Sequence, residues 1–200
     1  MVFTYLSLCF SPCLSPCLFP CDSSHRYSRS DNGKIVLVYV KHSPKCVGDC
    51  GTGNGVVYSS DGGATWTSPE DVSSDFGPAS GSLPGPGFAL QTKAGRIMVI
   101  SHHSAYQRDY VSFSDNGGNN WSTINQTFPL MDEATLTQLT NGSIMLNMRH
   151  KAAKTRGRAI SVSDDGGDTF GPIYYDHALI SPVCQASIAT FAGSTYVPNG

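Results

Sequence analysis

The sequence predicts an all-β protein with the β-propeller architecture, and three features of the chain predict it. A turn motif recurs about every 50 residues, as "SSDGGATW", "SDNGGNNW" and "SDDGGDTF". A turn glycine followed by an apolar run keeps step with it, as in "NGKIVLVYV", "AGRIMVIS" and "NGSIMLNM". No stretch shows a sustained 3.6-residue apolar period, which disfavours helices. A repeat of about 50 residues fits a propeller blade of four short antiparallel strands.

The composition narrows the classes of function. The 200 residues are 40% hydrophobic and 14% charged, with a formal net charge of -2. This near-neutral balance gives no reason to expect a nucleic acid or an anionic membrane surface as a partner. No apolar run approaches the ~20 residues that cross a bilayer. The sequence holds no phosphate-binding glycine loop and no His/Cys metal cluster, so we expect no cofactor and no metal.

The first 24 residues differ from the rest of the chain. They hold four cysteines at a spacing of four, and a proline directly precedes three of them, which disfavours a zinc site. We interpret residues 1–24 as a Cys/Pro-rich leader outside the fold and residues 25–200 as a partial propeller. A signal peptide is the alternative, because Val2 to Phe10 is mostly apolar, although no Lys or Arg precedes that run.

The cysteines and glycosylation triplets bear on the compartment. Cys46 and Cys50 can close a small loop disulfide in an oxidising compartment, whereas Cys184 is expected to be a buried free thiol. Three N-x-S/T triplets are compatible with secretion, at Asn120, Asn125 and Asn141. The compartment stays open, and an extracellular or lysosomal location is favoured.

The recurring Ser-x-Asp/Asn-x-Gly turns, called Asp-box turns below, have a physical explanation. The Asp or Asn side chain can bond backbone amides of its own turn, and glycine supplies the left-handed conformation. The aromatic residue that follows is expected to pack into the layer beneath, at Trp66, Trp121 and Phe170. Such turns predict a propeller blade and leave the function open.

The stretch "MDEATLTQLTNGSIMLNMRH" predicts a hairpin that carries one charge near each end. Asn141-Gly142 predicts a two-residue loop, in which Leu139 faces Ile144. Counting outward, Glu133 faces His150, and one bulge would set Arg149 opposite Glu133. Both charges then lie at the open end of the hairpin, where propeller strands reach the central channel. A purely structural ion pair is the alternative.

Two further segments carry candidate residues. "HKAAKTRGR", His150 to Arg158, is expected to be a basic loop that is either solvated or attracts an anionic ligand. His102, His103 and Tyr106 follow an apolar run, and they either line the mouth of a site or belong to a surface loop.

The chain resembles the sialidases, or exo-α-neuraminidases, which have six-bladed propellers. The Asp-box turns are shared with other families; the more specific segments are "GPGFALQ", "DEATLTQLTNGSIMLNMR" and "SPVCQAS". The resemblance runs from about Asp31 to the end of the chain. It implies a sialidase-type propeller of which three to four blades out of six are present.

The resemblance also implies a set of site residues. The family uses three arginines, an aspartate acid/base, a tyrosine nucleophile and a glutamate that activates the tyrosine. Glu133 matches that glutamate and Arg149 matches the second arginine, which grips the sialic acid carboxylate. Gln185 is a candidate for contacting the sugar's polar periphery. The other members match no residue of this chain, so we expect an incomplete copy that is inactive alone.

These residue types suit the implied chemistry. Sialic acid carries a carboxylate on its anomeric carbon, so a neutral phenol avoids the repulsion that a carboxylate nucleophile would meet. A phenol has a pKa of about 10 and needs a base, and arginine binds a carboxylate bidentately. The implied substrates are sialylated oligosaccharides, glycoproteins or glycolipids. The alternatives are a non-catalytic propeller or pseudoenzyme that binds sialic acid, and an Asp-box propeller for protein interaction.

Overall fold

Strands make up all the regular structure in the part of the chain that the computed structural model describes, which is residues 26–29, 33–42, 51–77, 82–85, 89–103, 107–150, 157–181, 184–191 and 194–196. The predicted all-β class is confirmed. The predicted leader, the Cys46–Cys50 disulfide and Tyr106 lie outside the described residues, as do Lys151, Lys154 and Arg156 of the basic loop.

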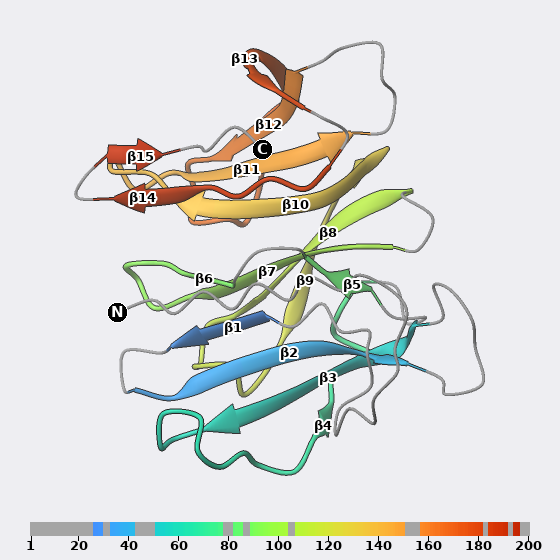
Figure 1. Cartoon of the computed structure of the whole chain (residues 1–200), viewed down its shortest axis with the longest axis vertical. Helices are drawn as coiled ribbons and strands as arrows, with labels where there is room; N and C mark the ends of the chain where they lie inside the picture. Colours follow the sequence, from blue (N-terminus) through green and yellow to red (C-terminus); the bar gives the residue numbers. More distant parts are fainter. Residues whose placement is uncertain are drawn as a thin grey trace, which may run out of the picture.

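Three antiparallel sheets and one hairpin follow one another along the chain (Figure 1). The first sheet holds β1 (Arg26–Arg29), β2 (Ile35–His42), β3 (Gly51–Ser59) and β4 (Glu70–Asp71). The second holds β5 (Leu83–Pro84), β6 (Leu90–Gln91), β7 (Ile97–His102), β8 (Arg108–Ser114) and β9 (Ser122–Pro129). The third holds β10 (Met131–Gln138), β11 (Ile144–His150), β12 (Gly157–Ser163) and β13 (Tyr174–Ile180), and β14 (Ala189–Phe191) pairs with β15 (Ser194–Tyr196).

The sheets are stacked as successive blades, from blue through green to orange in Figure 1. Strand β7 contains the apolar run "IMVIS", and its position between two blades explains why the run does not alternate with polar residues. Its side chains alternate between two cores, with Ile97 and Val99 packed toward the first blade and Met98 and Ile100 toward the third. A strand covered on both faces reads as a continuous apolar run.

The Asp-box turns form as expected, and all three use the same hydrogen bonds. The serine Oγ accepts a hydrogen bond from the amide of the second glycine, at 2.8 Å from Gly63, 2.9 Å from Gly118 and 2.8 Å from Gly167. The three glycines have φ of 96°, 90° and 93°, which only glycine adopts easily. The carboxylate of Asp61 accepts from the amide and hydroxyl of Thr65, which lowers its pKa.

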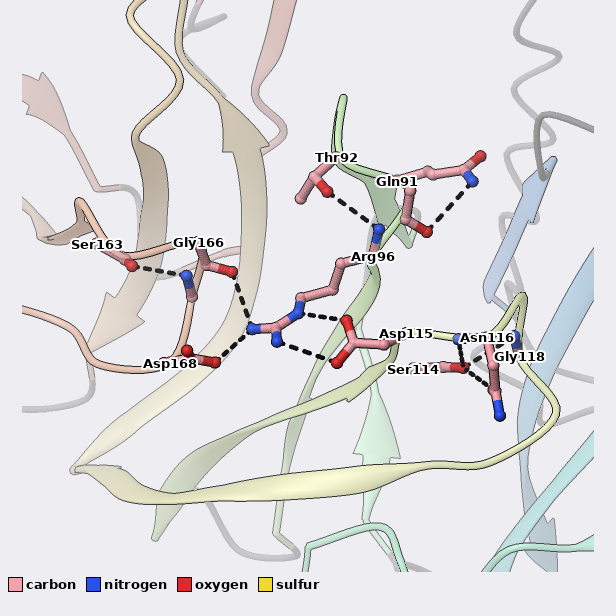
Figure 2. A network of polar contacts seen from close by, with 12 residues as sticks. Gln91, Thr92, Arg96, Ser114, Asp115, Asn116, Gly118, Ser163, Gly166 and Asp168 are labelled. Carbon is pink, nitrogen blue, oxygen red and sulfur yellow. Dashed lines mark hydrogen bonds and ion pairs between the residues drawn. The ribbon is translucent and has the colours of Figure 1, made fainter.

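These turns also tie neighbouring blades together, as Figure 2 shows for Arg96. Arg96 bonds both carboxylate oxygens of Asp115, in the turn of its own blade, at 2.7 and 3.1 Å. It also reaches the turn of the third blade, where it bonds Asp168 at 2.5 Å and the Gly166 carbonyl at 3.1 Å. Its guanidinium lies 4.3 Å from the centroid of the Phe113 ring.

The aromatic residues of the turns do not all behave as predicted. Trp121 and Phe170 are buried, and they pack on Phe76 and Phe128 of the preceding blade at centroid distances of 4.9 and 5.7 Å. Trp66 is 42% exposed, so the prediction is wrong there. No blade precedes the first one within the described residues, and the Trp66 indole instead donates to the Gly63 carbonyl of its own turn.

The loop of the β10–β11 hairpin is three residues long, not two as predicted. The Leu139 amide donates to the Ser143 carbonyl at 2.8 Å, and the Gly142 amide donates to the Leu139 carbonyl at 3.0 Å. Gly142 has φ of 97°, as in a type I turn followed by a left-handed glycine. In consequence Ile144 faces Gln138 and not Leu139, so the register differs by one residue from the prediction.

Candidate functional site

A bulge near the start of β10 aims the Glu133 side chain. The β10–β11 register shifts between Asp132 and Thr135, and Glu133 lies inside this irregularity with φ of 34°. A non-glycine residue in this region costs roughly 1–3 kcal/mol and is typical of functional sites. The predicted bulge exists, but the ladder partner of Arg149 is Asp132 and not Glu133. Bulges redirect side chains, which explains how Glu133 still reaches Arg149.

Glu133 and Arg149 form an ion pair that solvent reaches. The Arg149 Nη1 atom donates a hydrogen bond to Glu133 Oε2 and lies 3.5 Å from Asp132 Oδ2. The Arg149 side chain is 16% exposed and that of Glu133 is 24% exposed, whereas Asp132 is 1% exposed. The structure therefore brings the two charges of the hairpin together, with a third charged group buried beside them.

A third acidic residue, Asp109, lies close enough to feel the charges of this site, and the sequence did not single it out. Asp109 is fully buried on β8, where it faces His102 of β7 in the ladder. His102 Nε2 lies 3.6 Å from Asp132 Oδ1. Burial, and next the charge of Asp132, raises the pKa of Asp109 well above its usual range. The alternation of side chains along a strand could have predicted this burial, because Asp109 lies on the same strand face as the buried Val111.

Arg158 is not part of a basic loop, so that prediction is wrong. It lies on β12, which pairs with β11 and β13 on its two sides, and it is 2% exposed. Its Nε bonds the Asn147 side-chain oxygen at 2.6 Å, and its Nη1 bonds the Cys184 carbonyl at 3.1 Å. Burial lowers the pKa of Arg158 to about 10, so the guanidinium stays charged at neutral pH.

Arg158 thereby holds the segment that contains Gln185. Cys184 was expected to be a buried free thiol, but the free thiol is exposed, in a bend before β14. Its carbonyl, rather than its thiol, joins the segment to Arg158. The Gln185 side chain is exposed and makes no hydrogen bond to the described residues, so the structure fixes the backbone before Gln185 but does not bring its side chain to Arg149 or Glu133.

The described residues hold no group of three or more His, Cys, Asp or Glu side chains that is arranged to bind a metal ion. None of the segments described here forms a helix long and apolar enough to span a membrane.

Comparison with known proteins finds the same family that the sequence motifs resemble. Residues 12–197 match the family model of the BNR repeat-like domain. A sialidase of Micromonospora viridifaciens is 33% identical over 144 residues, which are 66% of this chain and 22% of the relative. An exo-alpha-sialidase of Arthroderma benhamiae is 28% identical over 135 residues, 66% of this chain and 31% of the relative. The chain thus spans less than a third of the length of these relatives.

Solved structures share the fold at lower identity. A Hadza microbial sialidase aligns with a TM-score of 0.67 and 20% identity over 84% of this chain and 36% of its own. The NanB sialidase of Streptococcus pneumoniae aligns with a TM-score of 0.68 and 12% identity over 88% of this chain and 44% of its own. An alpha-L-arabinanase of Penicillium chrysogenum also aligns, with a TM-score of 0.61 and 15% identity over 84% of this chain and 54% of its own. Since an arabinanase shares this architecture, the fold alone does not identify the substrate. The family match, the relatives and the blades together place the chain in the BNR repeat-like domain family, as a sialidase-family β-propeller.

Proposed function

We propose that this chain supplies the glutamate and one arginine of an exo-α-sialidase, a retaining glycoside hydrolase that removes terminal sialic acid from glycoconjugates. The observation that carries the proposal is the meeting of Glu133 and Arg149. They come from adjacent strands of the third blade, and both side chains reach solvent above a buried polar layer.

Arg149 has the chemistry to bind the substrate carboxylate. Its guanidinium is permanently charged, and its planar fork matches a carboxylate. In the structure the Nη1 atom bonds Glu133 Oε2. An incoming sialic acid carboxylate competes for this guanidinium, so substrate binding exchanges one carboxylate partner for another. The exchange couples binding to the release of Glu133.

Released from Arg149, Glu133 takes the role of a base. In the reaction that the family resemblance implies, a tyrosine hydroxyl attacks the anomeric carbon and its proton passes to the glutamate. A general acid protonates the departing glycosidic oxygen, and water later hydrolyses the tyrosyl intermediate. The tyrosine, the acid and two further arginines match no residue of the 200. The reaction is therefore proposed for the whole protein, and the mechanism uses no metal or organic cofactor.

Gln185 is proposed to contact the polar periphery of the sugar. Its exposed side chain is available for this role, and the backbone just before it is fixed by the hydrogen bond from Arg158 to the Cys184 carbonyl. The proposed substrates are sialylated oligosaccharides, glycoproteins or glycolipids.

A non-catalytic propeller or pseudoenzyme that binds sialic acid is the second candidate. The observation in its favour is that Glu133 and Asp132 both lie against Arg149, so the ion pair has a structural use without any substrate. The two candidates predict the same binding and differ in turnover.

Hydrolysis of a fluorogenic sialoside by the whole protein that carries this chain tests the proposal. We expect turnover by the wild type, and a loss of at least about 100-fold in kcat for Glu133→Gln with sialic acid binding retained. The wild type binding sialic acid without hydrolysing the sialoside would favour the second candidate. Wild-type kcat in Glu133→Gln would remove Glu133 from the mechanism.

A further inference from the structure

Charged side chains gather where the second and third blades meet. They come from β8, β10, β11 and β12 and form what we call the buried charge cluster, which consists of Asp109, Asp132, Glu133, Arg149 and Arg158. Three of its members are almost completely enclosed, with exposures of 0% for Asp109, 1% for Asp132 and 2% for Arg158. Glu133 and Arg149 form its solvent-facing side. The enclosed groups interact strongly because water does not screen them.

Asp109 is the member with the fewest partners. No hydrogen bond from the described residues reaches either of its buried carboxyl oxygens. Both guanidinium groups are engaged elsewhere, since Arg149 bonds Glu133 and Arg158 bonds Asn147 and the Cys184 carbonyl. An ionised carboxylate that is buried without a partner is very unfavourable and normally takes up a proton instead.

The charges of the cluster also leave room for one proton. Its three carboxylates and two guanidinium groups sum to one negative charge, and a single bound proton brings the sum to zero. His102 on β7 is the ladder partner of Asp109, and three charged groups of neighbouring strands act on it. Asp132 and Glu133 of β10 favour the protonated carboxyl, and Arg158 of β12 opposes it. The proton therefore resides either on a carboxyl or on the His102 imidazole, which lies 3.6 Å from Asp132.

We propose that Asp109 holds this proton at neutral pH and acts as the neutral member of a carboxyl pair with Asp132, which keeps the buried charge cluster uncharged beneath Glu133 and Arg149. Asp109 is favoured over His102 because it is fully enclosed and lacks any donor, and because protonation converts it from an unsatisfied acceptor into a donor. The direction of its pKa shift agrees.

The proposed proton has a consequence for ligands. Loss of the proton adds one buried negative charge below Arg149, and this charge opposes the approach of any anion to that guanidinium. Asp109 is thus a positioning residue that sets the charge of the site without touching the ligand. The inference concerns the resting protein and does not depend on the proposed hydrolysis.

Infrared spectroscopy tests the inference without an activity assay. At pH 7 the wild type is expected to show the C=O stretch of a protonated carboxylic acid. Asp109→Asn should lose this band, whereas His102→Gln and the exposed control Asp75→Asn should keep it. Asp132→Asn should keep the band at pH 7 but move its titration to lower pH, because the neighbouring negative charge is gone. Absence of the band in the wild type, or its persistence in Asp109→Asn, would overturn the proposal.

The pH dependence of unfolding gives an independent readout. A carboxyl whose folded pKa is raised stabilises the fold below its unfolded pKa, and this stability is lost as pH rises toward the folded pKa. The folding equilibrium constant of the wild type should fall about tenfold per pH unit above pH ~4 relative to Asp109→Asn, which has no such proton. Parallel pH profiles for the two proteins, or a flattened profile in His102→Gln instead, would contradict the assignment to Asp109.

Discussion

Arg149 of β11 donates a hydrogen bond to Glu133, although its partner in the β10–β11 ladder is Asp132. The bulge that holds Glu133 at φ of 34° creates this difference between ladder pairing and side-chain contact. One arginine is thereby shared between a buried carboxylate and a partly exposed one. This geometry connects the fold to the proposed chemistry, because an anionic ligand can compete only for a guanidinium that solvent reaches.

Replacing Arg149 should impair the whole protein. Arg149→Ala is expected to cost about 2–5 kcal/mol in transition-state binding, the range for truncating one partner of a hydrogen-bonded charge pair. Arg149→Lys should also be impaired, because lysine lacks the bidentate fork. The values of kcat/KM on a fluorogenic sialoside measure both effects. Arg108→Ala, an exposed arginine on β8, is the control and should remain at the wild-type level. Wild-type kcat/KM in either Arg149 variant would end the carboxylate-binding assignment.

The backbone at Glu133 predicts an unusual order of stabilities. Glu133→Gly and Glu133→Ala both remove the carboxylate and differ only in backbone freedom. Because φ is 34°, the glycine variant should be the more stable by about 1 kcal/mol, the reverse of the usual order in a strand. Thermal or urea unfolding measures the difference. At Met145, in the regular part of β11, the alanine variant should be the more stable of the matched pair. The usual order at Glu133 would show that the bulge is absent in solution.

Removing Arg96 should weaken the junction between the second and third blades. Arg96→Ala loses the paired hydrogen bonds to Asp115 and the contacts with Asp168 and Gly166 (Figure 2). It also loses the stacking on Phe113. Since both aspartates are largely exposed, the expected loss is only about 1–2 kcal/mol of unfolding free energy.

The loss in Arg96→Ala should shrink in high salt, which screens the ion pairs. Lys93→Ala, on the same turn with an exposed side chain, is the control and should change unfolding by less than about 0.5 kcal/mol. An equal effect of the two substitutions would mean that Arg96 does not bridge the blades.

Arg158→Met should destabilise the protein strongly. The substitution keeps an unbranched apolar stem but leaves the Asn147 oxygen and the Cys184 carbonyl without their buried donor. The expected loss is about 2–5 kcal/mol in unfolding free energy. The exposed Arg108→Met, measured in the same denaturant series, should be nearly neutral. If Arg158→Met unfolds at the same denaturant concentration as the wild type, Arg158 does not hold this segment.

Local patterns predicted the features that depend on neighbouring residues in the chain. The Asp-box turns follow from Ser, Asp or Asn and Gly at fixed spacing, and the structure confirms their hydrogen bonds. The hairpin was also predictable, but its register was not. Gly142 suits both a two-residue loop and the three-residue loop that forms, so the local sequence does not decide between the two registers.

Features that depend on a neighbouring blade escaped prediction. Trp66 has the same motif as Trp121, yet only Trp121 has a preceding blade to pack against among the described residues. Asp109 and Arg158 resemble ordinary surface charges in the sequence, and their burial arises from strands distant in the chain. Because charged residues are rarely buried, their residue type alone predicts that Asp109 and Arg158 lie on the surface. Strand alternation was the better guide for Asp109.

The most direct test of the central claim is calorimetric binding of sialic acid and its methyl ester to the whole protein and to Arg149→Ala. If a ligand carboxylate replaces Glu133 at Arg149, the acid should bind the wild type, while masking the carboxylate or removing the guanidinium should each abolish most of the affinity. Equal affinity of the wild type for acid and ester, or acid binding that survives in Arg149→Ala, would contradict the account.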